Sequence, residues 1–163
     1  MSALKKLNEF LMTIGSWGTI LFMTVMAIVI PYEVVGRYVF HSMTTWSGEV
    51  AIYSLAWASM LGAAVGLKKG YQIKMTFVVD ILPPFIAKAL HLAAHLFTLF
   101  FFGTLFYYGM YQTLYNAKQV SPGIEVVMSL PYAALPTGFF LMFFFTLEEF
   151  LLFLGLRVKG AEP

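Results

Sequence analysis

The stretch that decides the fold covers residues 44–80 and reads TTWSGEVAIYSLAWASMLGAAVGLKKGYQIKMTFVVD. It opens with Trp46 and Glu49 and ends its apolar part at a pair of lysines that begins with Lys68. Between these polar ends lie about twenty apolar or small residues, the number that a helix needs to cross a hydrocarbon core of ~30 Å. The stretch therefore predicts a membrane-spanning helix over residues 47–67.

Small residues recur along one side of this predicted helix. In lipid, helices associate where small side chains let their backbones approach closely, because burying leucine against leucine gains little over burying it against a lipid tail. The residues spaced four apart are Ser54, Ala58, Gly62 and Gly66, and the same side is widened by Ala51, Ser59 and Ala63. We expect this side to pack tightly against other helices, within the chain or at a subunit interface.

The composition excludes an ordinary soluble domain. Of 163 residues, 60% are hydrophobic and 11% are charged, and the mean hydropathy is +0.81. Cysteine is absent, which excludes disulfides, cysteine-ligated metals and thiol nucleophiles. The net charge of +2 gives no indication of nucleic-acid binding. The length suits a single membrane domain over residues 1–163.

Three further hydrophobic runs complete the predicted fold. We expect spans at about 11–38, 85–116 and 130–156, with amphipathic segments at the membrane surface over 1–10 and 68–84. The fold class is thus an all-α membrane protein with four transmembrane helices. A pair of prolines in the second surface segment is expected to end it and to start the third helix.

Lysine and arginine are distributed unequally between the two sides of this arrangement. Eight lie on the side of the two termini, and two, Arg37 and Lys118, lie on the other side. Positive residues are enriched in cytoplasmic segments. Both termini are therefore expected in the cytoplasm.

Two polar features mark the far end of the first two spans. Glu33 and Arg37 are four residues apart and can form an ion pair on one helix face. Glu49 is expected in the first turn of its helix, where the helix dipole favours a carboxylate. We interpret the pair as an anchor or an interchain contact.

A second acidic feature lies near the end of the fourth span. Glu148 and Glu149 either pair across the bundle with a lysine, or lie among lipid headgroups, and the second interpretation is favoured. The lysines available for pairing are Lys68, Lys69 and Lys88.

The third span carries a polar stripe that includes two histidines. His91 and His95 are four residues apart, which invites a metal or haem interpretation, but the remaining histidine, His41, is expected on the opposite side of the membrane. A proton relay is a second possibility. The favoured interpretation is hydrogen bonding to a neighbouring helix or to water. The other members of the stripe are Lys88, Thr98, Gln112 and Asn116.

The chain shows no catalytic set, no glycine-rich phosphate loop and no internal repeat. The spans read as unbroken and carry no carboxylate at mid-membrane depth, unlike the sites of secondary transporters. These features predict a protein that is not an enzyme, binds no metal or cofactor, and serves as an accessory subunit of a larger complex.

The segment from Glu33 to Met142 resembles the small permease subunit of tripartite ATP-independent periplasmic (TRAP) transporters, the DctQ-like family. The chain departs from the family pattern at Gln72 and Thr76, which leaves the role of that connection open. The matching positions are Arg37 and Tyr38 at the exit of the first helix, Trp46 and Glu49 at the entry of the second, Gly62, and Pro131, Tyr132, Pro136 and Gly138 at the entry of the fourth.

The resemblance implies a scaffold role in the bacterial inner membrane. It implies a large permease partner that holds the substrate and sodium ions, and a periplasmic binding protein that delivers an organic acid. The chain itself would hold no cofactor. Two alternatives stay open, namely the membrane anchor of a redox complex and a small homodimeric exporter.

Overall fold

The computed structural model describes residues 2–41, 45–70 and 83–155. Four stretches are long and apolar enough to cross a membrane, which confirms the all-α class with four membrane-spanning helices: Leu4–Tyr38, Thr45–Lys68, Pro84–Lys118 and Ser129–Phe153. The helices are α1 (Ser2–Tyr38), α2 (Thr45–Lys68), α4 (Pro84–Tyr115), the 3₁₀ helix η1 (Asn116–Lys118), α5 (Ser129–Tyr132) and α6 (Ala134–Phe153).

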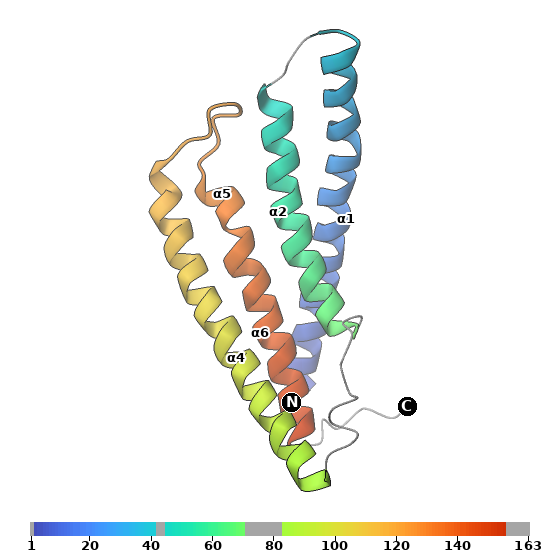
Figure 1. The fold of residues 1–163 in the computed structure, drawn as a ribbon, viewed down its shortest axis with the longest axis vertical. Helices are drawn as coiled ribbons and strands as arrows, with labels where there is room; N and C mark the ends of the chain where they lie inside the picture. Colours follow the sequence, from blue (N-terminus) through green and yellow to red (C-terminus); the bar gives the residue numbers. More distant parts are fainter. Residues whose placement is uncertain (1, 42–44, 71–82, 156–163) are drawn as a thin grey trace.

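The spanning helices form an open layer in the order α1, α2, α6, α4 (Figure 1). α2 packs on α1 along one side and on α6 along the other, and α4 packs on α6. Among the described residues α1 touches α6 over a short stretch, and α1 and α4 do not touch. The two interior helices are therefore α2 and α6, while α1 and α4 form the edges.

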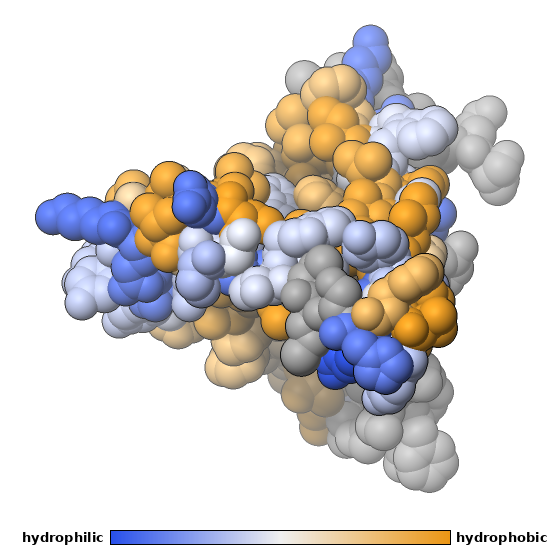
Figure 2. Space-filling model, turned by 90° about the horizontal axis from the view of Figure 1, so that it is seen from above, coloured by the Kyte–Doolittle hydropathy of each residue, from blue (hydrophilic) through white to orange (hydrophobic). Residues whose placement is uncertain are grey.

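The core lies between the two interior helices. Leu61 and Ala64 of α2 pack on Leu141, Met142 and Phe145 of α6, and all five side chains are buried. Large apolar side chains on the edge helices point outward instead, and hydrophobic residues cover the outer flanks when the molecule is seen from above (Figure 2). This distribution suits a protein whose solvent is lipid.

A close approach of backbones joins α2 to α6. A Cβ added at Gly138 would lie 2.8 Å from the Cβ of Met60 and 3.3 Å from its carbonyl oxygen. The contact requires glycine at this position, because real Cβ atoms do not approach one another so closely. Gly138, which matches the family pattern at the entry of the fourth helix, is therefore a point of close approach between α2 and α6.

The side of α2 predicted to pack tightly winds out of the core. Ser54 and Ala58 are buried, and a Cβ at Gly62 would lie 3.5 Å from Thr19 of α1. At Gly66 a Cβ would meet no described atom within 4 Å, so this position makes no tight packing with the described residues of the chain, and packing there at a subunit interface stays a prediction. Successive i, i+4 residues are rotated by about 40°, so a four-residue stripe leaves a contact face within three steps. Two other predicted members, Ser59 and Ala63, are exposed.

α1 is continuous from Ser2, so the N-terminal segment and the first span form one helix. One expectation about the spans needs correction. The fourth span is not unbroken, since it is interrupted at Ala133 between α5 and α6. Pro136 lacks the N–H that would bond the carbonyl three to four residues earlier, which weakens the helix at this point.

The start of the third span agrees with expectation. Pro83 precedes the helix and Pro84 is its first residue, the position that tolerates proline best. The predicted surface segment at 68–84 lies, over residues 71–82, outside the described residues, and so do Gln72 and Thr76.

Alanine substitutions at two glycines should have opposite effects on stability. Gly138→Ala forces Met60 to move and should destabilise the protein by roughly 1–3 kcal/mol. Gly66→Ala meets open space in a helix and should be neutral or stabilising by up to about 1 kcal/mol. Thermal unfolding of the two variants in detergent measures the difference, and equal shifts of the unfolding temperature would contradict the packing described here.

Candidate functional site: polar clusters at the two ends of the layer

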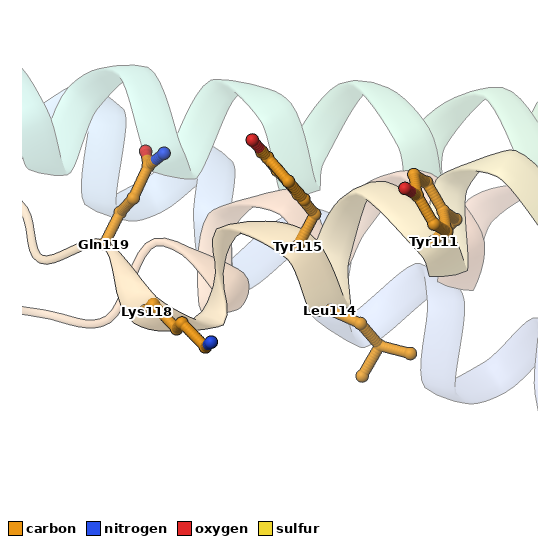
Figure 3. Close-up of a pocket in the computed structure, with 5 residues that line it drawn as sticks. All are labelled: Tyr111, Leu114, Tyr115, Lys118 and Gln119. Carbon is orange, nitrogen blue, oxygen red and sulfur yellow. The ribbon is translucent and has the colours of Figure 1, made fainter.

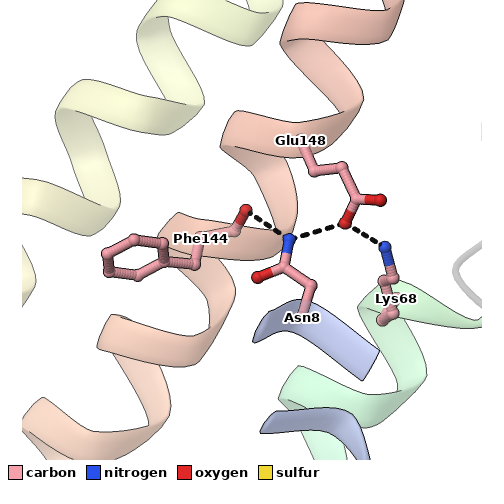
Figure 4. Close-up of polar contacts among 4 residues, drawn as sticks. All are labelled: Asn8, Lys68, Phe144 and Glu148. Atoms are coloured by element: carbon pink, nitrogen blue, oxygen red, sulfur yellow. Dashed lines mark hydrogen bonds and ion pairs between the residues drawn. The ribbon is translucent and has the colours of Figure 1, made fainter. Parts of the chain in front are cut away.

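A buried carboxylate joins three helices at the end of the layer where α1 begins. Glu148 of α6 accepts a hydrogen bond from Asn8 Nδ2 of α1 at 2.5 Å and forms an ion pair with Lys68 Nζ, at the last residue of α2 (Figure 4). Asn8 Nδ2 also donates to the Phe144 carbonyl at 3.2 Å. The Lys68 ammonium lies 5.7 Å from the centre of the Phe145 ring, which adds a cation–π contact.

Burial strengthens the polar interactions of this cluster and fixes the orientation of its amide. Asn8 is fully buried, and the side chain of Glu148 is 9% exposed. The Asn8 amide has one possible orientation, because its reversal would place its oxygen against the Glu148 carboxylate and the Phe144 carbonyl. In this orientation Asn8 Oδ1 has no hydrogen-bond partner among the described residues, and neither does the buried hydroxyl of Thr146.

The cluster corrects the favoured interpretation of Glu148. This carboxylate does not lie among headgroups but pairs with Lys68, which was one of the three lysines considered for it. Hydrocarbon gives a carboxylate no partner, so the charge is retained next to a lysine and an amide of the same chain.

A second carboxylate acts at the other end of α2. Glu49 accepts hydrogen bonds from the Ser121 hydroxyl, from the Gly123 N–H at 3.0 Å and from the Ile124 N–H at 3.1 Å. A Cβ added at Gly123 would lie 2.8 Å from the Glu49 carboxyl carbon, so glycine is required for this approach. The Glu49 carboxylate therefore holds the connection between α4 and α5.

This role of Glu49 differs from the predicted one. The helix begins at Thr45, so Glu49 lies beyond its first turn, and the donors to the carboxylate come from the connection rather than from its own helix. Two further side chains on the same face of α2 bind the end of this connection and the start of α5: Tyr53 bonds the Met128 sulfur and Trp57 donates to the Leu130 carbonyl.

The connection itself is a short hairpin-like turn. Val120 and Val127 form an isolated antiparallel bridge, and Ser121 is almost fully buried beneath it. Glu125 has a φ of 54°, a left-handed conformation that is uncommon for a residue other than glycine. Sequence analysis missed this contact, and its one local signal is the i, i+4, i+8 spacing of hydrogen-bonding side chains at positions 49, 53 and 57.

The first predicted ion pair is present. Arg37 bonds Glu33 at 2.9 Å, and both side chains are partly or largely exposed. One turn away the rings of Tyr32 and Trp46 lie 5.7 Å apart, which joins the end of α1 to the start of α2. Both contacts lie at the end opposite the Glu148 cluster (Figure 1).

The entry of the fourth span packs on α4. A Cβ at Gly109 would lie 3.2 Å from the Pro136 nitrogen and 3.3 Å from its Cδ. Pro131 and Pro136 are buried, and Tyr132 is half-buried at the end of α5. The proline-rich entry therefore lets the backbones of α4 and of the fourth span approach closely.

The hydrogen bonds found for the polar stripe of α4 are local rather than to a neighbouring helix, and the alternative of bonds to water stays a prediction. His95 Nδ1 lies 2.8 Å from the His91 carbonyl, and Thr98 and Asn116 also bond carbonyls of their own helix. The two histidine rings stack on phenylalanines of α6, namely Phe150 and Phe153.

The described part of the chain contains no group of three or more His, Asp or Glu side chains that could hold a metal ion. A hollow of about 560 Å³ lies at the end of α4, but its side chains diverge, with Tyr115 and Gln119 on one side and Lys118 and Leu114 on the other (Figure 3).

Breaking the Glu148 cluster should cost far more stability than breaking the exposed pair. Removing one partner of a buried ion pair typically costs ~3–5 kcal/mol, whereas an exposed pair contributes ~0–1 kcal/mol. We expect Lys68→Ala to lower the unfolding temperature in detergent strongly and Arg37→Ala to have little effect. A double-mutant cycle with Glu148→Ala and with Glu33→Ala measures each coupling, and similar coupling energies would refute the assigned difference.

Removing the Glu49 carboxylate should release the connection that it holds. Glu49→Ala leaves two backbone N–H groups and the Ser121 hydroxyl without their acceptor, at ~1–3 kcal/mol for each group that stays buried. Hydrogen exchange at Gly123 and Ile124 should accelerate at least tenfold. Glu125→Ala, an exposed carboxylate on the same connection, is the matched control and should leave those rates unchanged. Slow exchange in the Glu49 variant would show that the turn is held by other contacts.

Comparison with known proteins agrees with this architecture. Residues 26–155 match the family described as Tripartite ATP-independent periplasmic transporters, DctQ component. The sialic acid TRAP transporter small permease protein SiaQ of Vibrio cholerae is 24% identical over 146 residues, which cover 90% of this chain and 84% of that protein.

Two further relatives match over shorter stretches. The C4-dicarboxylate TRAP transporter small permease protein DctQ of Vibrio cholerae is 26% identical over 89 residues, covering 55% of this chain and 38% of that protein. The sialic acid TRAP transporter permease protein SiaT of Haemophilus influenzae is 32% identical over 88 residues, covering 54% of this chain and 13% of that protein. Since the family match covers most of the chain, this protein belongs to the DctQ component family of tripartite ATP-independent periplasmic transporters.

Proposed function

We propose that this chain is a static scaffold subunit of a TRAP transporter and carries no transport site of its own. It would support a large permease subunit that binds the substrate and sodium ions, and a periplasmic binding protein would deliver an organic acid. The chain would enlarge the fixed part of the complex against which the transport domain of the permease moves.

This proposal rests on where the charged residues lie along the spans and on which groups the buried carboxylates bind. Residues 10–32, 50–67, 89–115 and 126–147 contain no Asp, Glu, Lys or Arg, so no carboxylate lies at mid-membrane depth to couple an ion. The carboxylates at the two ends, Glu49 and Glu148, are engaged with the chain itself. Their hydrogen bonds fix helices and a connection rather than leave groups for a moving substrate.

The distribution of positive charge supports a cytoplasmic location of both termini. In the described part of the chain, the end with the Glu148 cluster also carries Lys5, Lys6, Lys69 and Lys88, while the opposite end carries Arg37 and Lys118. The positive-inside rule then places the Glu148 cluster at the cytoplasmic face of a bacterial inner membrane and Glu49 at the periplasmic face.

The names of the relatives support the partners that we propose for this chain. Two of them are small permease proteins of TRAP transporters. The third is called a permease protein, and the stretch that matches this chain covers 13% of it. The substrates in their names, sialic acid and C4-dicarboxylates, are organic acids, which is the substrate class that we propose for the complex.

Reconstitution tests the scaffold role. Sodium-driven uptake in proteoliposomes should require the large permease, the binding protein and this chain together, because the permease needs its fixed neighbour to move against. This chain reconstituted alone should transport nothing. Uptake by the chain alone, as expected of a homodimeric exporter, or undiminished uptake without it, would refute the proposal.

Two controls accompany the uptake measurement. Replacing His91 and His95 together by phenylalanine should leave uptake by the full complex largely intact, and haem absorbance lost in that variant would instead favour a redox anchor. In cells, a reporter that is active in the periplasm alone and is fused after Pro163 should be silent, and activity there would reverse the orientation.

A further inference from the structure

The two ends of α2 define the level of the hydrocarbon layer. Lys68 follows Glu49 by nineteen residues, which corresponds to about 28 Å of helix. This distance matches a hydrocarbon core of ~30 Å. Both residues are fixed by polar contacts within the chain, Glu49 with the connection at 121–124 and Lys68 with Glu148. Their levels therefore mark the two boundaries of the apolar layer.

The end of α1 extends past one of these boundaries. A Cβ at Gly48, next to Glu49, would lie 3.8 Å from both carboxylate oxygens of Glu33, so Glu33 lies at the level of the boundary. The helix continues for five residues to Tyr38, or about 7 Å. This end of α1 rises above the start of α2 and above the connection between α4 and α5 (Figure 1).

The extending segment is apolar and exposed. Tyr38 and Phe40 are each 72% exposed and Val39 is 63% exposed. We call the α1 tip the set of exposed apolar residues beyond Glu33, which are Val34, Val35, Tyr38, Val39 and Phe40. The charge within this segment, Arg37, is paired with Glu33 of the same helix. A surface of this kind next to water is unusual unless a partner covers it.

We propose that the α1 tip is a docking surface for the water-exposed side of the large permease subunit. This inference rests on the proposed function. A segment that extends about 7 Å beyond the hydrocarbon layer lies at the level of the polar headgroups, where lipid tails do not reach, so protein is the fully apolar cover available to it. Of the two protein partners, the binding protein has to dissociate, and interfaces that dissociate are more polar than permanent ones.

The relatives point to the same occupant. In Haemophilus influenzae the matching stretch covers 13% of one chain called a permease protein, so a region like this one is permanently joined to a larger permease polypeptide. A permanent neighbour can cover an apolar surface at all times. The α1 tip thus suits the permease better than it suits the binding protein.

Accessibility of a single cysteine tests the docking surface. The chain contains no cysteine, so Val39→Cys provides a unique thiol once the permease has also been made cysteine-free. In membranes with this chain alone, a membrane-impermeant maleimide should label Val39→Cys readily. Co-production of the large permease should slow labelling at least tenfold, and added binding protein should change it no further. Ile28→Cys, an equally exposed position of α1 within the hydrocarbon layer, should remain unlabelled throughout.

Each other outcome overturns the proposal. Unchanged labelling with the permease present would show that the tip faces water in the complex. Absence of labelling in the chain alone would show that the bilayer covers it or that a second copy does. Protection that requires the binding protein would make that protein the occupant. If the chain fails to co-purify with the permease at all, the proposed function itself fails, whereas co-purification without protection removes the docking surface alone.

A charge substitution gives a second, independent measurement. Val39→Asp should reduce the amount of large permease that co-purifies with the chain at least fivefold, while its unfolding temperature stays unchanged because the side chain packs on little. Val127→Asp, an exposed valine on the connection at the same end, is the matched control and should leave recovery unchanged. Equal recovery with both variants would contradict docking at the tip.

Discussion

A carboxylate that a helix carries to the edge of a hydrocarbon layer has to find its hydrogen-bond donors within the protein. In this chain that requirement is met twice, by Glu148 at one end of the layer and by Glu49 at the other. Between the two ends the helices contact each other through small and apolar side chains, where packing alone has little preference for one register over another. The polar clusters therefore set the register of the helices, and the close approaches at Gly138 and Gly109 fit within it.

α2 is the element on which both clusters converge. Its last residue pairs with α6, and its second turn holds the connection that leads into α5 and α6. α2 is thus tied to α6 at one end, and at the other end to the connection that precedes α5 and α6, although these segments are far apart in the sequence. The edge helices are attached differently, since α1 depends on α2 along its length and α4 on α6. An open layer of this kind leaves the outer faces of its helices available to lipid or to another protein.

What the sequence could predict was local. The four spans, the helix start at Pro84 and the ion pair between Glu33 and Arg37 follow from hydropathy, from proline chemistry and from a spacing of four residues. Glu148 bonds Asn8 and Lys68, which lie 140 and 80 residues away in the sequence. The residues that Glu49 bonds are about as distant in the sequence as Lys68 is from Glu148. No local pattern selects such partners. The stripe of small residues on α2 lies in the core at Ser54 and Ala58 and turns away from it toward Gly66, because a strict four-residue spacing rotates around a helix of 3.6 residues per turn.

The same contacts bear on whether this chain moves during transport. Separating α2 from α6 at the Glu148 end would leave a charge without its partner in a largely buried site, which typically costs ~3–5 kcal/mol. An alternative state that lies a few kcal/mol higher is populated to about 1% or less. Opening at the Glu49 end would add the loss of three hydrogen bonds. Polar contacts at both ends therefore oppose sliding of α2 against α6, which is the behaviour that the proposed scaffold role requires and that a helix pair built to slide would lack.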